Sequence, residues 1–229
     1  MTESALSVVM LGATGAVGSH VAKTLATMPD VGSLTLLGRR PLEGLLGDQI
    51  LQRSIDVLDT ASYEAFLPGH PAAICTLGVG QPSKISKDEF VKIDKRAVIA
   101  FASACKDVGV GHFALLGSVG ANPRSRSFYL RTKGELEEEL KSMGFERLSL
   151  FRPSLILTPT NRYGLAQALA LAIWPRLSPF LSGGLRRYRG IQVDRLGYAM
   201  AVNLRTRKTG VEILHWDAID ALAEQSVHE

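Results

Sequence analysis

The chain has 229 residues, of which 46% are hydrophobic and 21% are charged, and its formal net charge is +4. This length and balance suit one folded domain and argue against long disordered, low-complexity or repeated segments. The two cysteines, Cys75 and Cys105, lie in apolar stretches without the spacing of a zinc site or a disulfide framework, so we expect a reducing, cytoplasmic setting.

The apolar stretches carry no targeting or membrane signal. The first one has no basic residue before it and leads into glycines, so we predict no signal peptide. The longest later stretch, residues 163–181, is interrupted by Pro175, Arg176 and Pro179, which would put charge and kinks near the middle of a membrane span. We therefore predict an amphipathic helix of a soluble protein there and no membrane span.

Short apolar runs typical of buried parallel strands alternate along the chain with longer helical patterns. The clearest helix begins at Ser86, where Glu89 completes a capping box, and its apolar face continues to Ala104. This alternation predicts an α/β fold with a doubly wound parallel sheet, in which ligands bind at the carboxyl ends of the strands. The expected strands are residues 5–11, 33–38, 52–58, 72–78, 112–117 and 147–152.

The first expected strand runs into a glycine-rich turn, GATGAVG, in which three glycines are spaced three residues apart. Glycines there let backbone N–H groups and the amino end of the next helix approach a pyrophosphate. The alternative is a tight turn that needs glycine for its shape alone. The place of the turn after the first strand favours nucleotide binding, by Gly12, Thr14, Gly15, Ala16, Val17 and Gly18.

The end of the second expected strand bears on which nucleotide binds. An NAD site usually has an acidic residue about twenty residues beyond the glycines. Here no Asp or Glu occurs between Asp30 and Glu43. Arg39 and Arg40 instead offer planar cations that suit a 2′-phosphate, unless they only solvate a surface loop. The sequence therefore favours NADP(H) over NAD(H).

Later strand ends extend the same expected site. Asp56 and Val57 close the third strand where an adenine would lie, although Asp56 also fits a simple loop cap. Leu77 and Gly78 belong to the sequence TLGVG, where ribose and pyrophosphate need a close backbone. Ser118 ends the fifth strand, and a hydroxyl there can hold a substrate carbonyl, although a lone serine after a strand is more often a turn residue.

Tyr129 and Lys133 lie four residues apart where a charged helix begins, in the sequence SFYLRTKGELEEEL. Such a pair arises by chance often enough to be weak evidence alone. On a helix this spacing puts both side chains on one face, where the ammonium would favour the ionised form of the phenol. Together with Ser118, the pair predicts acid/base chemistry on a carbonyl or alcohol.

The glycine turn, Ser118, Tyr129 and Lys133 in this order resemble the short-chain dehydrogenase/reductase superfamily. Residues 115–157 resemble more closely the atypical subgroup of the human Tat-interacting oxidoreductase, and the chain shares with it the motifs GRR, LG, S-x-GA, Y-x-x-x-KGE and FRP. The resemblance implies a Rossmann domain that binds NADP(H), with Tyr129 as acid/base, Lys133 on the nicotinamide ribose and Ser118 on the carbonyl. It also implies that Pro153 lies beside the nicotinamide carboxamide.

Two departures from the superfamily pattern concern proton delivery. Many members have a relay asparagine in the helix after the fourth strand, whereas residues 84–110 contain none and Asp94 lies nearest that place. The usual Ser-Ser before the site is Gly117-Ser118 here. An NADP(H)-binding sensor or scaffold protein without significant turnover therefore remains the alternative to an oxidoreductase.

The C-terminal region, residues 158–229, is expected to supply the substrate pocket within a single domain of residues 1–229. Within it, residues 184–208 carry seven arginines and lysines against only Asp194. Such an excess attracts an acidic substrate or a partner, or simply forms a solvated face. No nucleic-acid module accompanies it, so we expect a small-molecule substrate and no nucleic acid, with assembly into a homo-oligomer left open.

Overall fold

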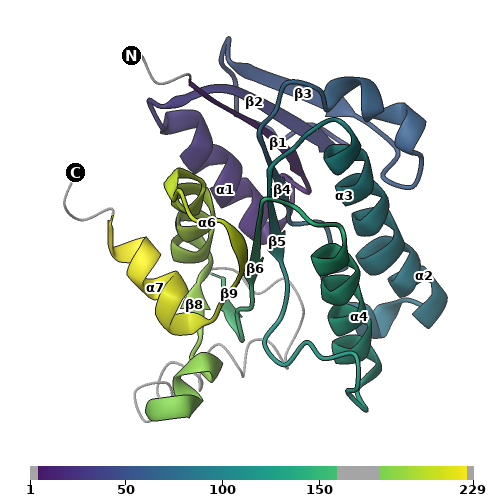
Figure 1. The fold of residues 1–229 in the computed structure, drawn as a ribbon, viewed down its shortest axis with the longest axis vertical. Coiled ribbons are helices and arrows are strands. Elements are labelled where there is room, and N and C mark those ends of the chain that lie inside the picture. The colour runs from purple at the N-terminus through teal and green to yellow at the C-terminus, as the bar shows by residue number, and fades with distance from the viewer. Residues whose placement is uncertain (1–4, 159–180, 226–229) are drawn as a thin grey trace.

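The computed structural model describes residues 5–158 and 181–225, which form a parallel sheet covered by helices on both faces (Figure 1). The seven-stranded sheet has the order β3-β2-β1-β4-β5-β6-β9, and its neighbouring strands pair in parallel. This is a Rossmann-like, doubly wound arrangement, as the alternation in the sequence predicts. The strands are β1 (Leu6–Leu11), β2 (Val31–Gly38), β3 (Ile50–Ser54), β4 (Ala72–Cys75), β5 (His112–Leu116), β6 (Arg147–Phe151) and β9 (Gly210–Leu214).

The helices divide between the two faces of the sheet (Figure 1). On one face lie α1 (Ala16–Thr27), α6 (Val193–Val202) and α7 (Trp216–Glu224). On the other lie α2 (Lys87–Val91), a π-helical turn η4 (Lys92–Ala97), α3 (Val98–Asp107) and α4 (Phe128–Ser142). Two short strands, β7 (Ile156–Leu157) and β8 (Ile191–Gln192), form a separate pair. The 3₁₀ turns are η1 (Thr60–Ser62), η2 (Glu64–Phe66), η3 (Pro82–Lys84), η6 (Gly183–Tyr188) and η7 (Asn203–Arg205).

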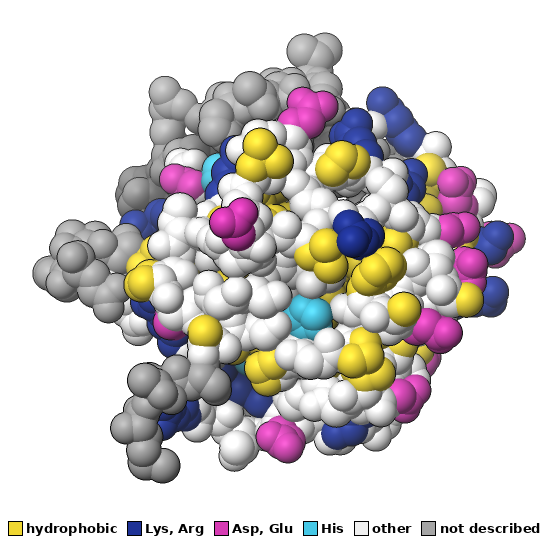
Figure 2. Space-filling model, turned by 90° about the horizontal axis from the view of Figure 1, so that it is seen from above, with side chains coloured by type: hydrophobic (Ala, Val, Ile, Leu, Met, Phe, Trp, Pro, Cys, Tyr) yellow, Lys and Arg dark blue, Asp and Glu magenta, His cyan; other side chains and the backbone are white. Residues whose placement is uncertain are grey.

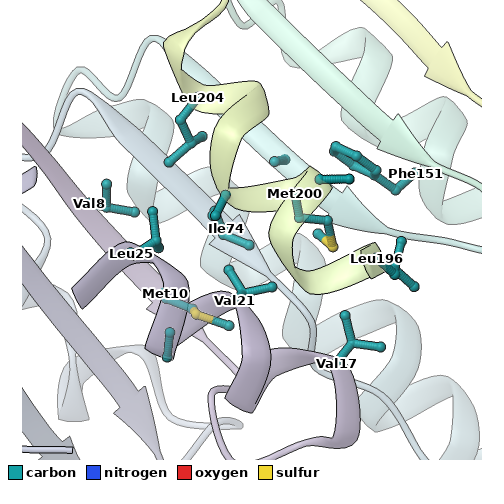
Figure 3. Close-up of a cluster of buried hydrophobic side chains, with 14 of the residues drawn as sticks. Val8, Met10, Val17, Val21, Leu25, Ile74, Phe151, Leu196, Met200 and Leu204 are labelled. Atoms are coloured by element: carbon teal, nitrogen blue, oxygen red, sulfur yellow. The ribbon is translucent and has the colours of Figure 1, made fainter. Parts of the chain in front are cut away.

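Residues 8–11 of the central strand β1 are buried on both faces, which explains their continuous apolar sequence, VVML. Val8 and Met10 point into the core beneath α1 and α6, whereas Val9 and Leu11 point into the core beneath α3 and α4, and all four are fully buried. Figure 3 shows the first of these cores, where α1 and α6 pack together over the sheet. The labelled side chains are Val8, Met10, Val17, Val21, Leu25, Ile74, Phe151, Leu196, Met200 and Leu204.

Close contact between α1 and α6 joins the C-terminal part of the chain to the half that contains the glycine-rich turn. A Cβ atom at Gly197 would lie 2.5 Å from the Cβ atom of His20, so only glycine permits this spacing of the two helices. Residues 191–224 thus complete the helical layer that contains α1, and they supply β9 at the edge of the sheet.

A buried polar cluster ties β9 to its neighbours near the amino ends of the strands. The Oε1 atom of Glu212 accepts hydrogen bonds from Ser149 at 2.6 Å, from Arg147 at 2.6 Å and from Asn203 at 3.1 Å. His112 Nε2 lies 2.8 Å from the Ser149 hydroxyl oxygen. Burial and the Arg147 charge lower the pKa of His112 to about 3, so this imidazole is neutral in the folded protein.

The expected strands and helix are confirmed with shifted ends. The third strand ends at Ser54, so Asp56 and Val57 follow this strand instead of closing it. The strand stops because Asp56 caps a turn, in which its Oδ1 atom accepts a hydrogen bond from the Leu58 N–H at 2.9 Å. The serine half of the capping box at Ser86 is present, because the Ser86 hydroxyl accepts a hydrogen bond from the Glu89 N–H at 3.1 Å.

Figure 2 shows the molecule from the top of Figure 1, the side where α3 ends and β5 begins. On this face, positive and negative side chains are interspersed around isolated apolar ones.

Candidate cofactor and active site

The glycine-rich turn between β1 and α1 lies against the end of β4. Gly12 has a φ of +96°, and a Cβ atom there would lie 2.6 Å from the Leu77 nitrogen. A Cβ atom at Gly18 would lie 2.2 Å from the Gly12 oxygen, so the start of α1 also packs on the turn. Thr76 closes the contact, because its hydroxyl donates a hydrogen bond to the Gly12 oxygen at 3.0 Å. The turn therefore has the bare backbone that a pyrophosphate site needs.

Two hollows lie at the carboxyl ends of the strands and meet at this turn. The first has a volume of about 260 Å³ and the second about 490 Å³. Four residues line both of them: Gly15, Thr76, Leu77 and Gly78. Two adjoining hollows around a glycine turn match the two halves of a dinucleotide, and this is the crevice where a doubly wound sheet binds one.

The second hollow contains most of the residues expected to hold the adenosine side. Besides the four shared residues, its lining consists of Gly12, Thr14, Gly38, Arg39, Arg40 and Val57. The two arginines are exposed, and no acidic residue belongs to this lining. Asp56 also stays outside it, and its side chain serves the turn after β3.

The first hollow brings Tyr129 and Lys133 together with the glycine turn. Its lining also contains Ala16, Val17, Val79, Gly80, Asp94, Leu116, Gly117, Ile156 and Thr158. Helix α4 begins at Phe128 because the Ser127 hydroxyl caps it, and the four-residue spacing then puts both side chains on one helical face. In the structure the pair therefore lies beside the glycine-rich turn, and its catalytic role stays a prediction.

Lys133 forms a buried ion pair with Asp94. Its ammonium lies 2.8 Å from the Asp94 Oδ1 atom, and the two side chains are 6% and 2% exposed. Burial lowers the pKa of Lys133, but its neighbours, the Asp94 carboxylate first among them, raise it more, so the pKa lies above its ordinary value. Lys133 is therefore a permanent cation near neutral pH.

Ser118 and Pro153 lie next to the site without lining either hollow. The Ser118 hydroxyl donates a long hydrogen bond of 3.3 Å to the Val119 oxygen. The Val119 N–H in turn donates to the Pro153 oxygen at 2.9 Å, and this bond fixes the loop after β5 against the chain after β6. The roles of Ser118 on the carbonyl and of Pro153 on the carboxamide remain predictions.

Gly117 stands where many superfamily members have a serine, and a buried ion pair explains the difference. Glu137 is 1% exposed and is paired with Arg152, whose Nε atom donates to Glu137 Oε2 at 3.0 Å. A Cβ atom at Gly117 would lie 2.9 Å from the Glu137 Oε1 atom and 3.3 Å from the Phe151 oxygen. A serine therefore does not fit there unless this ion pair moves.

Several lining residues were missed by sequence reasoning. Thr76, Val79 and Gly80 belong to the TLGVG sequence that indicated the site, so their neighbourhood was visible although their individual roles were not. Leu116, Ile156 and Thr158 give no local signal in the sequence. The amphipathic helix expected in residues 163–181 falls almost wholly on residues 159–180, outside the described part of the chain.

Three of the seven basic residues in the segment 184–208 form ion pairs with aspartates from elsewhere in the chain. Ion pairs join Arg186 to Asp217 at 2.7 Å and Arg195 to Asp220 at 2.6 Å, and a third joins Arg205 to Asp30 at 2.7 Å. The local excess of positive charge in the sequence therefore overstates the positive charge of the folded surface.

Comparison with known proteins agrees with this geometry. A family model described as NAD(P)H-binding matches residues 12–168, more than half of the chain. The chain belongs to this NAD(P)H-binding family. Protein HTATIP2 of Rattus norvegicus is 31% identical over 223 residues, which cover 96% of this chain and 90% of the relative. "Protein fmp52, mitochondrial" of Emericella nidulans is 31% identical over 169 residues, 72% of each chain.

Solved structures support the fold of this NAD(P)H-binding protein. MoeE5 in complex with UDP-glucuronic acid and NAD superimposes with a TM-score of 0.71 at 18% identity, and the match covers 91% of this chain and 75% of that chain. The family and the relatives together make this chain an atypical member of the short-chain dehydrogenase/reductase type, with an NAD(P)H-binding, oxidoreductase-like fold. Within residues 5–158 and 181–225, no helix of this NAD(P)H-binding protein is long and apolar enough to cross a bilayer.

Proposed function

We propose that this protein is an NADP(H)-dependent oxidoreductase that acts on a small carbonyl or alcohol substrate. The observation that supports this best is that Tyr129 and Lys133 share one hollow with the glycine turn and the loop after β4. A protein that only senses the cofactor does not need a phenol and an ammonium at that place. The choice of NADP(H) rests on Arg39 and Arg40, which line the second hollow in the absence of a lining acid.

In this proposal the bound cofactor supplies or accepts the hydride. Tyr129 donates a proton to the carbonyl oxygen during reduction and takes it back during oxidation. Lys133 stabilises the phenolate by its charge and binds the nicotinamide ribose. The Ser118 hydroxyl donates a hydrogen bond to the carbonyl oxygen. To do so it gives up its 3.3 Å hydrogen bond to the Val119 oxygen, which is near the limit of hydrogen-bonding distance.

We also propose that residues 158–229 contribute the substrate pocket, because Thr158, the first residue of this region, lines the first hollow. A cytoplasmic location is likewise our proposal. The fungal relatives carry the word mitochondrial in their names, so fractionation of cells that express the native chain is the test of location.

The test of enzyme activity is an NADPH absorbance assay with a panel of aldehydes and ketones. We expect NADPH oxidation that requires both the protein and one class of carbonyl compound. With NADPH deuterated at the nicotinamide C4, the deuterium should be recovered on the alcohol carbon of the product. Tight NADPH binding without oxidation by any member of the panel would instead support a sensor or scaffold. One observation favours that second candidate: Ser118 does not line the hollow that contains Tyr129 and Lys133.

A further inference from the structure

We propose that Asp94 is a positioning residue of this site, which holds the Lys133 ammonium in place and ties it to the loop after β4. This proposal deepens the proposed function. Its consequences for turnover rest on that function, whereas the position and charge of Lys133 do not. No feature of the sequence assigns Asp94 this role, and the asparagine that many superfamily members have near this place has no carboxylate with which to perform it.

The geometry uses both oxygens of the carboxylate. Asp94 lies in the π-helical turn η4 and is 2% exposed. Its Oδ1 atom lies 2.8 Å from the Lys133 ammonium, and its Oδ2 atom accepts a hydrogen bond from the Val79 N–H at 2.7 Å. One side chain therefore bridges α4 to the loop after β4. An asparagine has one acceptor oxygen, so it can accept from only one of these partners while its NH₂ group faces the other donor.

The ion pair lies directly against a residue of the expected cofactor site. A Cβ atom at Gly78 would lie 3.0 Å from the Asp94 Oδ1 atom and 3.9 Å from the Lys133 ammonium. Gly78 lines both hollows, so the pair is in contact with the backbone at the point where the two hollows meet. A shift of Asp94 would therefore change the position of Lys133 and of this backbone together.

The charge of Lys133 depends on the same carboxylate. The titratable groups that face Lys133 are Asp94 from η4, Tyr129 from its own helix and Cys75 from β4. Burial raises the pKa of Cys75 to about 12, so this thiol is neutral. With Tyr129 as a phenol, Asp94 is the anion among these groups that offsets the burial of the ammonium. Without it, a buried lysine loses its proton at a lower pH.

The consequence for the site is a pH range set by Asp94. A neutral Lys133 no longer stabilises the Tyr129 phenolate and binds the ribose less well. Asp94→Asn should therefore make the activity and the cofactor affinity fall at a lower pH than in the unaltered protein. A residue that only stabilised the fold would change stability without moving that pH dependence.

The direct test follows the titration of Lys133 in the protein without cofactor. Chains labelled with ¹³C at lysine Cε are titrated by NMR, and the Lys133 signal is assigned from its loss in Lys133→Met. We expect the signal to titrate at least about one pH unit lower in Asp94→Asn than in the unaltered chain. The matched control is Asp88→Asn, an exposed aspartate in the adjoining helix α2, which should leave the titration unchanged. An unchanged Lys133 titration in folded Asp94→Asn overturns the proposal.

A second measurement applies if Asp94→Asn folds poorly. Lys133→Met alone leaves a buried carboxylate without its partner and should lower the folding equilibrium constant by roughly a hundredfold or more. The double variant Asp94→Asn/Lys133→Met should then be at least about tenfold more favourable than the product of the two single effects. Strictly additive effects in urea denaturation would contradict the pairing.

Calorimetry with NADPH separates this proposal from the proposed function. At pH 6 and pH 9, the affinity of Asp94→Asn for NADPH should fall more with rising pH than that of the unaltered protein and of Asp88→Asn. If the unaltered protein binds no NADPH, the proposed function fails, whereas the NMR titration still decides the role of Asp94. If it binds NADPH and the three affinities share one pH dependence, the link from Asp94 to the cofactor site is refuted.

Discussion

Replacing Arg39 and Arg40 together by alanine should remove most of a preference for NADPH over NADH. Both side chains are exposed and line the second hollow, so solvent screens part of their attraction for a 2′-phosphate. A hydrogen bond to a charged group contributes about 1.5 to 3 kcal/mol and an exposed ion pair about 1 kcal/mol or less. Two such arginines therefore give about 2 to 3 kcal/mol, on the order of 30- to 150-fold in dissociation constant.

The assay is calorimetry with NADPH and NADH at one fixed ionic strength, for the unaltered chain, both single variants and the double variant. The affinity for NADH should change little, because it has no 2′-phosphate. Arg53→Ala is the matched control, since Arg53 is exposed on β3 and packs over the Phe66 ring at 5.3 Å without lining the hollow. Equal affinity for both cofactors in the unaltered protein, or an unchanged ratio in the double variant, would refute the reasoning.

Three further predictions concern stability and the basic segment. Burial and Arg147 lower the pKa of His112 to about 3, so between about pH 6.5 and pH 3 the unfolded chain binds one proton more than the folded chain. The free energy of unfolding should therefore fall by at most about 5 kcal/mol as the pH drops through this range. Urea denaturation of His112→Gln should show a flatter pH dependence, and an equal slope would contradict the assignment. Gly117→Ser should lower the free energy of unfolding by about 1 to 3 kcal/mol through its clash with Glu137, and an unchanged urea midpoint would count against that contact. The double change of Arg186 and Arg187 to serine should shift stability by about half a kcal/mol or less and leave calorimetric NADPH affinity unchanged, whereas a large loss of affinity would place these arginines in the site.

The sequence predicts the central part of the fold because its strands are buried on both faces. Residues 8–11 of β1 show this as an unbroken apolar run, VVML. The edge strand β9 was missed because Val211 and Ile213 are 52% and 42% exposed, and because Glu212 serves the polar cluster with β6. Its five residues therefore carry no pattern that separates them from a loop.

Local spacing also explains which parts of the site were predictable. The glycine turn and the four-residue interval from Tyr129 to Lys133 are properties of short segments, so each could be seen in the sequence. The contact between Asp94 and Lys133 joins η4, which precedes β5 in the sequence, to α4, which follows it. No local pattern in the sequence indicates such a contact. The direction of the Ser118 hydroxyl likewise depends on the Val119 carbonyl in the folded loop.

The most direct test of the central claim is the turnover of Tyr129→Phe on a confirmed carbonyl substrate, measured alongside its affinity for NADPH. Tyr129→Phe should lower kcat by at least about a hundredfold while NADPH still binds, because the substitution removes the hydroxyl that exchanges the proton and leaves the ring in place. Tyr198→Phe is the matched control, since the same atom is removed from α6, outside the linings of both hollows. Full activity of Tyr129→Phe would contradict the oxidoreductase mechanism and make the sensor the leading account.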